Sequence, residues 1–326
     1  MAGALITGAA GFIGSHLAAR LLAEGLAVRG IDNLDPYYPA WIKERRLATL
    51  RAAPGFDWRP GDLRRADLPA LLDGVTWVFH LAARPGVRAS WGDGFDEYAR
   101  ANVLATQRLF EALRDRPVER VVFASSSSVY GENASGDAGE EAPRRPISPY
   151  GVSKLAGEGL AWAYHASYGV PVVALRYFTV YGPEQRPDMA FHRFLRALLE
   201  GREIEVYGDG RQTRDFTFVG DAVEATWRAA RAGEPGAVYN IGGGSPAGLG
   251  EVIAMLETLT GREARVRLSP ARPGDPRATR ADTRRAREAF GYAPVTGLRE
   301  GLARMAEWMP GFLAAEAALG AEHGAA

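Results

Sequence analysis

The chain has 326 residues, of which 47% are hydrophobic, and its 39 lysines and arginines balance 39 aspartates and glutamates. This length allows one large α/β unit or two lobes, and the balanced charge gives no sign of nucleic-acid binding. The sequence contains no cysteine, which excludes disulfides, thiolate chemistry and cysteine metal sites.

The N-terminal segment is typical of a dinucleotide-binding turn. A short buried strand is expected over residues 2–7, and three glycines spaced GxxGxxG in residues 8–14 open the following helix. Such glycines allow a tight turn and a close approach of the backbone to a pyrophosphate at the helix N-terminus. The next strand, residues 27–31, ends in Asp32, which would accept hydrogen bonds from an adenosine ribose and repel a 2′-phosphate. We therefore predict a site for NAD rather than NADP.

Because the N-terminus leads directly into this strand, we expect no signal peptide or membrane span and a cytoplasmic location. The five histidines lack the spacing of metal ligands, so no metal site is predicted. His80, at the end of an apolar strand, is expected to be structural.

Strands and helices alternate along the first half of the chain, which predicts a doubly wound α/β fold with a parallel sheet. Further strands are expected at residues 56–59, 75–81, 120–125 and 172–177, and long helices at residues 93–114 and 149–168. Past residue 182 the alternation gives way to loops rich in arginine and proline, which we interpret as a smaller C-terminal substrate domain.

The predicted division is a dinucleotide-binding Rossmann domain at residues 1–178 and a substrate domain at residues 179–326. Within the second domain, residues 216–241 are expected to return to the main sheet as a helix, residues 216–232, and a strand. Residues 131–146 are acidic and rich in glycine and proline, which predicts a surface loop near the site. The tail beyond residue 319 is expected to fray.

A serine, a tyrosine and a lysine form the candidate catalytic group. Tyr150 and Lys154 are four residues apart on a predicted helix and therefore share one face. An ammonium beside a phenol favours the phenolate, so Tyr150 is expected to act as a base below its ordinary pKa of about 10. Ser126, at the end of a preceding strand, can hydrogen-bond the same substrate hydroxyl. Such a group removes a proton from an alcohol while a hydride leaves its carbon for a nicotinamide.

Taken together, these strings resemble the extended short-chain dehydrogenase/reductase family, and within it the nucleotide-sugar 4-epimerases, above all the UDP-glucuronate 4-epimerases. The resemblance covers nearly the whole chain and is carried by residues 8–14, 32–38, 62, 80–88, 102, 126, 150, 154, 176–183 and 186–190. It implies NAD as cofactor and a UDP-sugar as substrate. It also implies a homodimer formed by the helices at residues 93–114 and 149–168, packed as a four-helix bundle.

The resemblance also implies which positions contact the ligands. The implied cofactor contacts are Gly8, Gly11, Phe12 and Ile13 at the pyrophosphate, Asp32 and Asn33 at the adenosine ribose, Asp62 and Leu63 at the adenine, Leu81, Ala82 and Ala83 along the cofactor, Asn102 at the pocket's cap, Tyr150 and Lys154 at the nicotinamide ribose, and Tyr177. The implied substrate contacts are Ser127, Ser128, Thr179 and Arg186 at the sugar, Val206 and Tyr207 at the uracil, Arg214 and Arg272 at the diphosphate, and Asp275 at the uridine ribose. Guanidinium groups suit the diphosphate because they form forked, charge-assisted contacts with phosphate.

The residues after Ser126 bear on the reaction. Dehydration of a 4-keto sugar needs a general acid and a base, and dehydratases that resemble this chain carry an Asp-Glu pair where Ser127 and Ser128 stand. Decarboxylases of the family keep the glutamate. The absence of both carboxylates favours 4-epimerisation through a transient 4-keto intermediate.

The choice of sugar depends on Thr179, which stands where hexose 4-epimerases usually have asparagine. Thr179, Ser127 and Ser128 offer neutral hydroxyls that can bind a carboxylate, which favours conversion of UDP-glucuronate to UDP-galacturonate. A UDP-glucose/UDP-galactose 4-epimerase is the first alternative. Another enzyme of the family or a non-catalytic NAD-binding regulator is also possible, although such regulators typically lose the tyrosine or the lysine.

Overall fold

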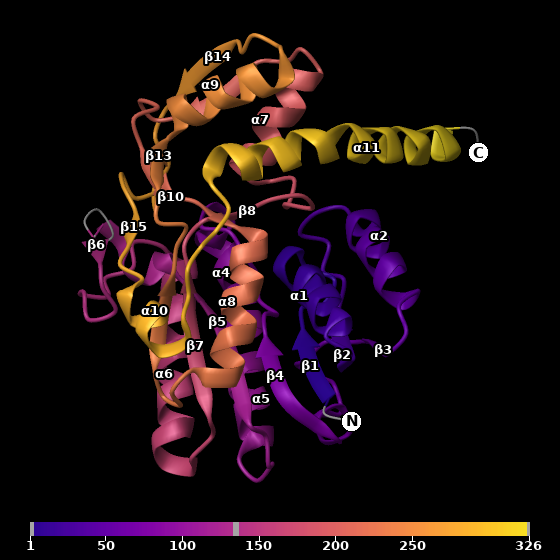
Figure 1. Cartoon of the computed structure of the whole chain (residues 1–326), viewed down its shortest axis with the longest axis vertical. Coiled ribbons are helices and arrows are strands. Elements are labelled where there is room, and N and C mark those ends of the chain that lie inside the picture. The colour runs from indigo at the N-terminus through magenta and orange to yellow at the C-terminus, as the bar shows by residue number, and fades with distance from the viewer. Residues whose placement is uncertain (1–2, 133–136, 325–326) are drawn as a thin grey trace.

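The computed structural model describes residues 3–132 and 137–324, and a seven-stranded parallel sheet forms its centre (Figure 1). The strand order is β12-β7-β5-β4-β1-β2-β3, which confirms the predicted doubly wound α/β fold. The strands of this sheet are β1 (Gly3–Thr7), β2 (Ala27–Asp32), β3 (Phe56–Pro60), β4 (Val75–His80), β5 (Arg120–Ser126), β7 (Val172–Tyr177) and β12 (Val238–Ile241).

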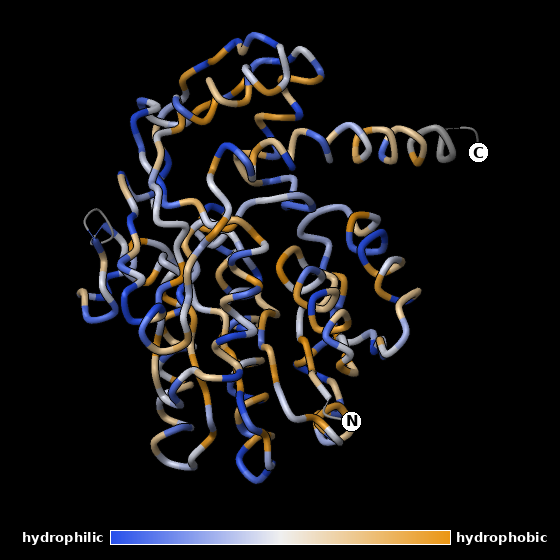
Figure 2. The backbone as a smooth tube through the Cα atoms, viewed as in Figure 1, coloured by the Kyte–Doolittle hydropathy of each residue, from blue (hydrophilic) through white to orange (hydrophobic). Residues whose placement is uncertain are grey.

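Helices cover both faces of this sheet, so its strands are buried on both sides. Leu5 and Ile6 are neighbours in β1 and both are 0% exposed, yet they belong to two different apolar clusters because successive side chains point to opposite faces. Figure 2 shows hydrophobic residues along the central strands. One face is covered by α1 (Phe12–Ala23), α2 (Ala40–Arg51) and α8 (Val219–Ala232), and the other by α3 (Leu68–Leu71), α5 (Ala105–Leu113) and α6 (Pro149–Tyr168).

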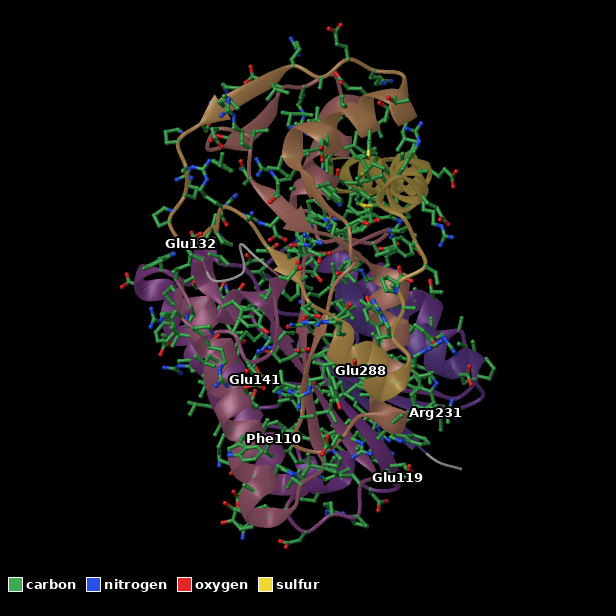
Figure 3. All side chains as sticks on the ribbon, turned by 60° about the vertical axis from the view of Figure 1, so that its left-hand side comes forward. Phe110, Glu119, Glu132, Glu141, Arg231 and Glu288 are labelled. Carbon is green, nitrogen blue, oxygen red and sulfur yellow. The ribbon has the colours of Figure 1, made fainter. Side chains whose placement is uncertain are left out.

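Most of the remaining C-terminal elements form a smaller lobe beyond the carboxyl ends of the sheet strands (Figure 1). In Figure 3, Glu132 lies at the end of the larger lobe that faces this smaller lobe, and Glu119, just before β5, lies at the opposite end. The C-terminal elements, some of which lie beside the main sheet, are β8 (Val180–Tyr181), α7 (Ala190–Leu199), β9 (Ile204–Tyr207), β10 (Thr213–Asp215), β11 (Thr217–Phe218), β13 (Pro246–Gly248), α9 (Leu249–Thr260), β14 (Val266–Ser269), β15 (Arg280–Ala281), α10 (Arg284–Phe290) and α11 (Leu298–Gly324). The division at residues 178 and 179 stays a prediction.

Four details of the structure differ from the sequence-based expectations. The helix expected at residues 93–114 is divided into η2 (Gly92–Gly94), α4 (Phe95–Tyr98), the π-helical segment η3 (Ala99–Leu104) and α5. The helix expected from residue 216 begins at Val219, because the two residues before it form β11 and pair with β8. The tail does not fray at residue 319, because α11 continues to Gly324.

The fourth difference is helix α2, which the sequence analysis did not predict. Its buried face includes the charged side chains Lys43 and Arg46, so the sequence lacks the apolar stripe that usually reveals a surface helix.

Of the predicted loop at residues 131–146, residues 133–136 lie outside the described residues, and β6 (Asp137–Ala138) pairs with β15. The short helices η1 (Arg88–Ser90) and η4 (Ser127–Val129) lie at the carboxyl ends of β4 and β5.

A buried ion pair fixes α6 against the sheet. The Arg176 guanidinium on β7 makes two bonds to Glu158 on α6, at 2.8 and 2.7 Å, and the two side chains are 1% and 4% exposed. Glu158 also accepts a hydrogen bond from Ser125, while Lys154, one turn earlier on α6, donates to the Ala124 carbonyl at 2.8 Å. These contacts hold α6 along the end of β5, next to Ser126.

We expect Glu158→Gln to lower the free energy of unfolding by about 3–5 kcal/mol, because the guanidinium of Arg176 would remain buried without its counter-charge. Urea unfolding measures this loss. Glu44→Gln is the matched control, because the Arg51–Glu44 pair is 43% and 45% exposed and such pairs contribute only about 0–1 kcal/mol. Equal losses in the two variants would contradict the structural role of the buried pair.

Candidate active site

A cavity of about 690 Å³ opens at the carboxyl ends of the sheet strands, between the sheet and the C-terminal lobe. Of the residues predicted to contact a cofactor or substrate, all except Asn102 and Arg272 line this cavity. The site therefore lies where ligands bind in doubly wound sheets, outside the strand ends and near the point where the strand order reverses. Here that point lies between β1 and β4.

The turn between β1 and α1 fits a pyrophosphate. Gly8 has φ +75°, and a Cβ built on it would lie 2.8 Å from the Ala82 amide nitrogen, so only glycine fits. Helix α1 begins at Phe12, and its N-cap residue Gly11 offers no side-chain hydrogen bond to the first-turn amides. These amides point to the cavity end of the helix, where they and the helix dipole favour an anion.

Asp32 lines the side of the cavity where the sequence predicts an adenosine ribose. Its carboxylate accepts hydrogen bonds from the Ala10 amide at 3.2 Å and the Leu34 amide at 2.8 Å. Burial raises the pKa of Asp32, and the Lys43 ammonium, 3.9 Å away, opposes that shift. Lys43 lines the cavity and is only 6% exposed, so a cation that the sequence analysis missed lies beside the predicted ribose site.

The side of the cavity that is predicted to bind adenine contains a carboxylate with a low pKa. The Arg64 guanidinium bonds both oxygens of Asp62 and lowers the pKa of Asp62 to about 2. Asn33 also donates to Asp62, at 3.1 Å. Asp62 is therefore a fixed acceptor at this end of the cavity, as its predicted contact with an adenine amine requires.

The predicted catalytic group comes together at the N-terminus of α6. The Ser148 side chain caps this helix by accepting from the Gly151 amide at 3.1 Å, and the Tyr150 amide donates to Ser90 at 3.1 Å. A Cβ on Gly151 would lie 2.6 Å from the Ser128 carbonyl oxygen, so the glycine lets α6 approach the serine run closely. Ser126 and Ser128 are themselves joined through their hydroxyls at 3.2 Å.

The electrostatics of Tyr150 differ from the expectation. Burial raises the pKa of Tyr150, and the opposing effects come from a hydrogen bond with Ser126 and from the charge of Arg186. Lys154 instead donates to the Ala124 carbonyl, and burial lowers its pKa to about 8. Arg186 was predicted only as a sugar contact, and its charge also favours the phenolate.

The far end of the cavity is rich in guanidinium groups. Tyr207, on β9, has three of them over its ring, from Arg88 at 4.2 Å, Arg272 at 5.0 Å and Arg193 at 5.6 Å. Arg214 also lines the cavity there, and Asp275 pairs with Arg88 at 3.0 Å. This concentration of positive charge suits a diphosphate.

Three residues that were predicted to contact a ligand have side chains that are bonded elsewhere or lie outside the cavity. Asn102 is 2% exposed within the π-helical segment and uses its amide on the Arg84 backbone and Ser153. Arg272 is exposed and does not line the cavity, but its guanidinium lies over the ring of Tyr207, which does. Tyr177 lines the cavity, but its hydroxyl bonds Thr226 on α8 at 2.7 Å.

Comparison with known proteins identifies the family. The family model for the NAD dependent epimerase/dehydratase family matches residues 4–242. The chain belongs to this family. This membership confirms the resemblance seen in the sequence.

Relatives of this epimerase/dehydratase family member match it over nearly their whole length. The Bacillus subtilis protein YtcB, named an uncharacterized UDP-glucose epimerase, is 45% identical over 91% of this chain and 95% of its own length. The UDP-glucuronic acid 4-epimerase from Bacillus cereus, solved with UDP-glucuronic acid and NAD, is 42% identical with a TM-score of 0.93, covering 95% of this chain and 99% of its own. MoeE5, solved with UDP-glucose and NAD, is 48% identical with a TM-score of 0.86, covering 95% and 99% of the two chains.

Sequence reasoning missed several cavity residues. Arg88 and Tyr37 lie in strings that carried the resemblance, so their positions were available although they received no role. Lys43 and Arg193 have no such signal, because each is a cationic residue on a helix that could equally face solvent. Among residues 3–132 and 137–324, no group of acidic, histidine or cysteine side chains could hold a metal ion, and no helix is long and apolar enough to cross a bilayer.

We expect Asp32→Ala to weaken NAD binding by roughly 10–150-fold, since a hydrogen bond to a charged group contributes about 1.5–3 kcal/mol. The preference for NAD over NADP should narrow as well, because the repulsion of a 2′-phosphate is lost while Lys43 remains beside the ribose site. Titrating the cofactor-free protein with each dinucleotide measures both effects. Asp57→Ala, which removes a carboxylate on β3 that pairs with Arg29, is the control. An unchanged preference in Asp32→Ala would count against the assignment.

Proposed function

We propose that this protein catalyses NAD-dependent 4-epimerisation of a UDP-sugar and that its main substrate is UDP-glucuronate, converted to UDP-galacturonate. The observation that carries the proposal is the meeting of Ser126, Tyr150 and Lys154 beside hydroxyls, rather than carboxylates, at positions 127 and 128. The similar Bacillus cereus enzyme, solved with UDP-glucuronic acid and NAD, supports the choice of sugar.

The proposed cofactor fits the residues present. The amides at the start of α1 would hold its pyrophosphate, and Asp32 would hold the adenosine ribose. When bound, NAD supplies the group that accepts a hydride from C4 of the sugar and returns it to the opposite face. Tyr150 would take the proton of the C4 hydroxyl and later return it, with Ser126 hydrogen-bonded to the same oxygen.

The hydroxyls of Ser127, Ser128 and Thr179 would bind the C6 carboxylate. A 4-keto uronate is a β-keto acid and loses CO₂ readily when its C5–C6 bond lines up with the carbonyl π system. Rigid hydroxyl contacts would hold that bond out of line and so keep the reaction on the path of epimerisation. The guanidinium groups around Tyr207, together with Arg214, would hold the diphosphate while the 4-keto sugar rotates to present its other face.

The direct test compares kcat/KM with UDP-glucuronate and UDP-glucose as separate substrates. The proposal expects the higher value with UDP-glucuronate, and a higher value with UDP-glucose would overturn it. NAD should also co-purify at near-equal stoichiometry, because an epimerase regenerates its cofactor in place whereas a net redox enzyme releases it.

A UDP-glucose/UDP-galactose 4-epimerase is the second candidate. It is favoured by the 45% identity to YtcB, which is named an uncharacterized UDP-glucose epimerase. MoeE5, 48% identical, has been solved with UDP-glucose and also with UDP-glucuronic acid, so it is compatible with both candidates. The same kcat/KM comparison separates the two candidates.

We also propose a homodimer formed by the helices at residues 93–114 and 149–168. Large apolar side chains exposed on these helices support it, with Leu104 at 60%, Val152 at 47% and Trp162 at 61%. Light scattering should give twice the chain mass of 35.1 kDa, and a mass of one chain at micromolar concentration would contradict the proposal.

We place the enzyme in the cytoplasm, where NAD and nucleotide sugars are available together.

A further inference from the structure

Arg46, on α2, joins three loops that surround the candidate active site. The Arg46 side chain itself does not line the cavity. Its side chain is 2% exposed. One guanidinium nitrogen donates to the Ala10 carbonyl at 3.1 Å and to the Tyr38 hydroxyl at 2.8 Å. The other terminal nitrogen donates to the Glu184 carbonyl at 2.5 Å, and Nε reaches the Glu184 carboxylate at 3.4 Å.

The three loops joined in this way have different tasks in the proposed reaction. Ala10 lies in the turn that would hold the pyrophosphate, and its amide also donates to Asp32. Tyr38 lies near the end of the loop that follows Asp32. Glu184 lies in the substrate loop, which we define as residues 182–189, between β8 and α7.

Glu184 holds an unusual backbone conformation. Its φ is +65°, and Leu34, in the loop after Asp32, is the other non-glycine residue with positive φ in the described part of the chain. Left-handed backbone of this kind persists only where surrounding contacts enforce it. For Glu184 these contacts are Arg45 and Arg46 on α2 and the Trp308 indole on α11, at 3.1 Å.

Helix α11 supports this arrangement from the C-terminal lobe. Figure 1 shows α11 passing close to α2, and the Trp41 and Phe312 rings lie 5.0 Å apart between these two helices. The Arg45 guanidinium covers the Trp308 and Phe312 rings at 5.7 and 5.3 Å. Glu184 is therefore held where the dinucleotide-binding sheet and the C-terminal lobe meet.

The substrate loop carries its functional side chain two residues after Glu184. Arg186 makes a forked pair with Asp188, with both bonds at 2.9 Å, and lies over the Tyr37 ring at 5.8 Å. Arg186 and Asp188 line the cavity, and the charge of Arg186 acts on Tyr150. A shift of the backbone at Glu184 would therefore move a cation at the sugar end of the site.

We propose that Arg46 and Glu184 are positioning residues that hold the substrate loop against the pyrophosphate turn, so that NAD binding and sugar binding support each other. Bound NAD would order the turn at Ala10 and thereby the Arg46 side chain and the loop. A sugar bound at Arg186 would then lose less freedom on binding, which gives positive coupling without a change of fold. Coupling between two sites is reciprocal and typically amounts to about 5–150-fold in affinity. This inference rests on the proposed function.

The test uses the full-length protein with Tyr150→Phe, which blocks turnover, and adds Arg46→Lys or Glu184→Gln. Arg46→Lys keeps the charge but loses the fork, and Glu184→Gln keeps the carbonyl acceptor but loses the carboxylate. Arg45→Lys is the matched control, because Arg45 pairs with the same glutamate but is 30% exposed and, within the part of the chain that the structure describes, makes no hydrogen bond to Ala10 or Tyr38. The dissociation constants of UDP-glucuronate and of UDP are measured with NAD bound, and that of NAD with and without UDP-glucuronate.

The expected result is that Arg46→Lys and Glu184→Gln weaken UDP-glucuronate binding by at least about 5-fold, which is the lower end of the usual coupling range. Both variants should leave UDP binding within about 2-fold of the unsubstituted value. Both should also remove the tightening of NAD by UDP-glucuronate, while Arg45→Lys keeps it. Equal losses for UDP and UDP-glucuronate, or equal behaviour of Arg46→Lys and Arg45→Lys, would overturn the inference. Should the wild-type protein fail to epimerise any UDP-sugar, the proposed function falls, whereas these binding constants test the link between the loops independently.

Discussion

Tyr150→Phe should lower kcat by roughly 10²–10⁴, the usual contribution of a general base, while NAD stays bound. The phenol lies at the N-terminus of α6, lines the cavity beside Ser126, and can take a proton from a substrate hydroxyl bound there. The Phe ring keeps the edge-on packing of Tyr150 against Tyr98, whose centroid lies 6.2 Å away, so the cavity wall should be preserved. Initial rates with UDP-glucuronate, together with the NAD content of the purified variant, measure the effect.

Tyr168→Phe provides the matched control for this substitution. Tyr168 ends the same helix, is 51% exposed and lies far along α6 from the cavity, so the loss of its hydroxyl should leave turnover unchanged. Near-wild-type turnover in Tyr150→Phe would remove Tyr150 from the role of acid and base. Loss of NAD from that variant would show instead that the hydroxyl is needed for cofactor binding.

The second large effect is expected from Thr179→Ala, which should lower kcat/KM for UDP-glucuronate by roughly 10–150-fold. A hydrogen bond to a charged group contributes about 1.5–3 kcal/mol, and this range converts to that factor. Thr179 follows β7 and lines the cavity together with Ser127 and Ser128, so its hydroxyl can complete a row of neutral donors around a carboxylate. Any activity on UDP-glucose, which lacks that carboxylate, should change far less.

The product mixture offers a second readout of Thr179→Ala. A carboxylate that is held less firmly can swing into line with the C4 carbonyl, so the variant should release some CO₂ and form a UDP-pentose. Chromatography of the nucleotide sugars after long incubation detects this by-product. An equal loss of activity on both sugars, with no UDP-pentose, would show that Thr179 supports the site without binding the carboxylate.

Local sequence was enough to predict which candidate catalytic residues lie together on one element of the fold. Tyr150 and Lys154 share one helix face wherever the helix lies in the fold, because the 3.6-residue period alone sets their relative direction. The glycine turn and Asp32 likewise depend on a single strand–turn–helix–strand unit. Strands that end in functional residues then converge, because parallel strands bring their carboxyl ends to one edge of the sheet.

Tertiary structure alone decided how the loops around this edge are held. Arg46 and Glu184 are 138 residues apart, and Arg88 and Asp275 are 187 apart, so no local period links them. Arginine and glutamate are also the usual residues of solvated surfaces, which hides their burial from a reading of composition. The pKa of Tyr150 is a further case, because burial and Arg186 act on it through space whereas helical spacing pointed to Lys154. Short-range periodicity specifies which groups share one element, and packing between distant elements decides which charges those groups meet.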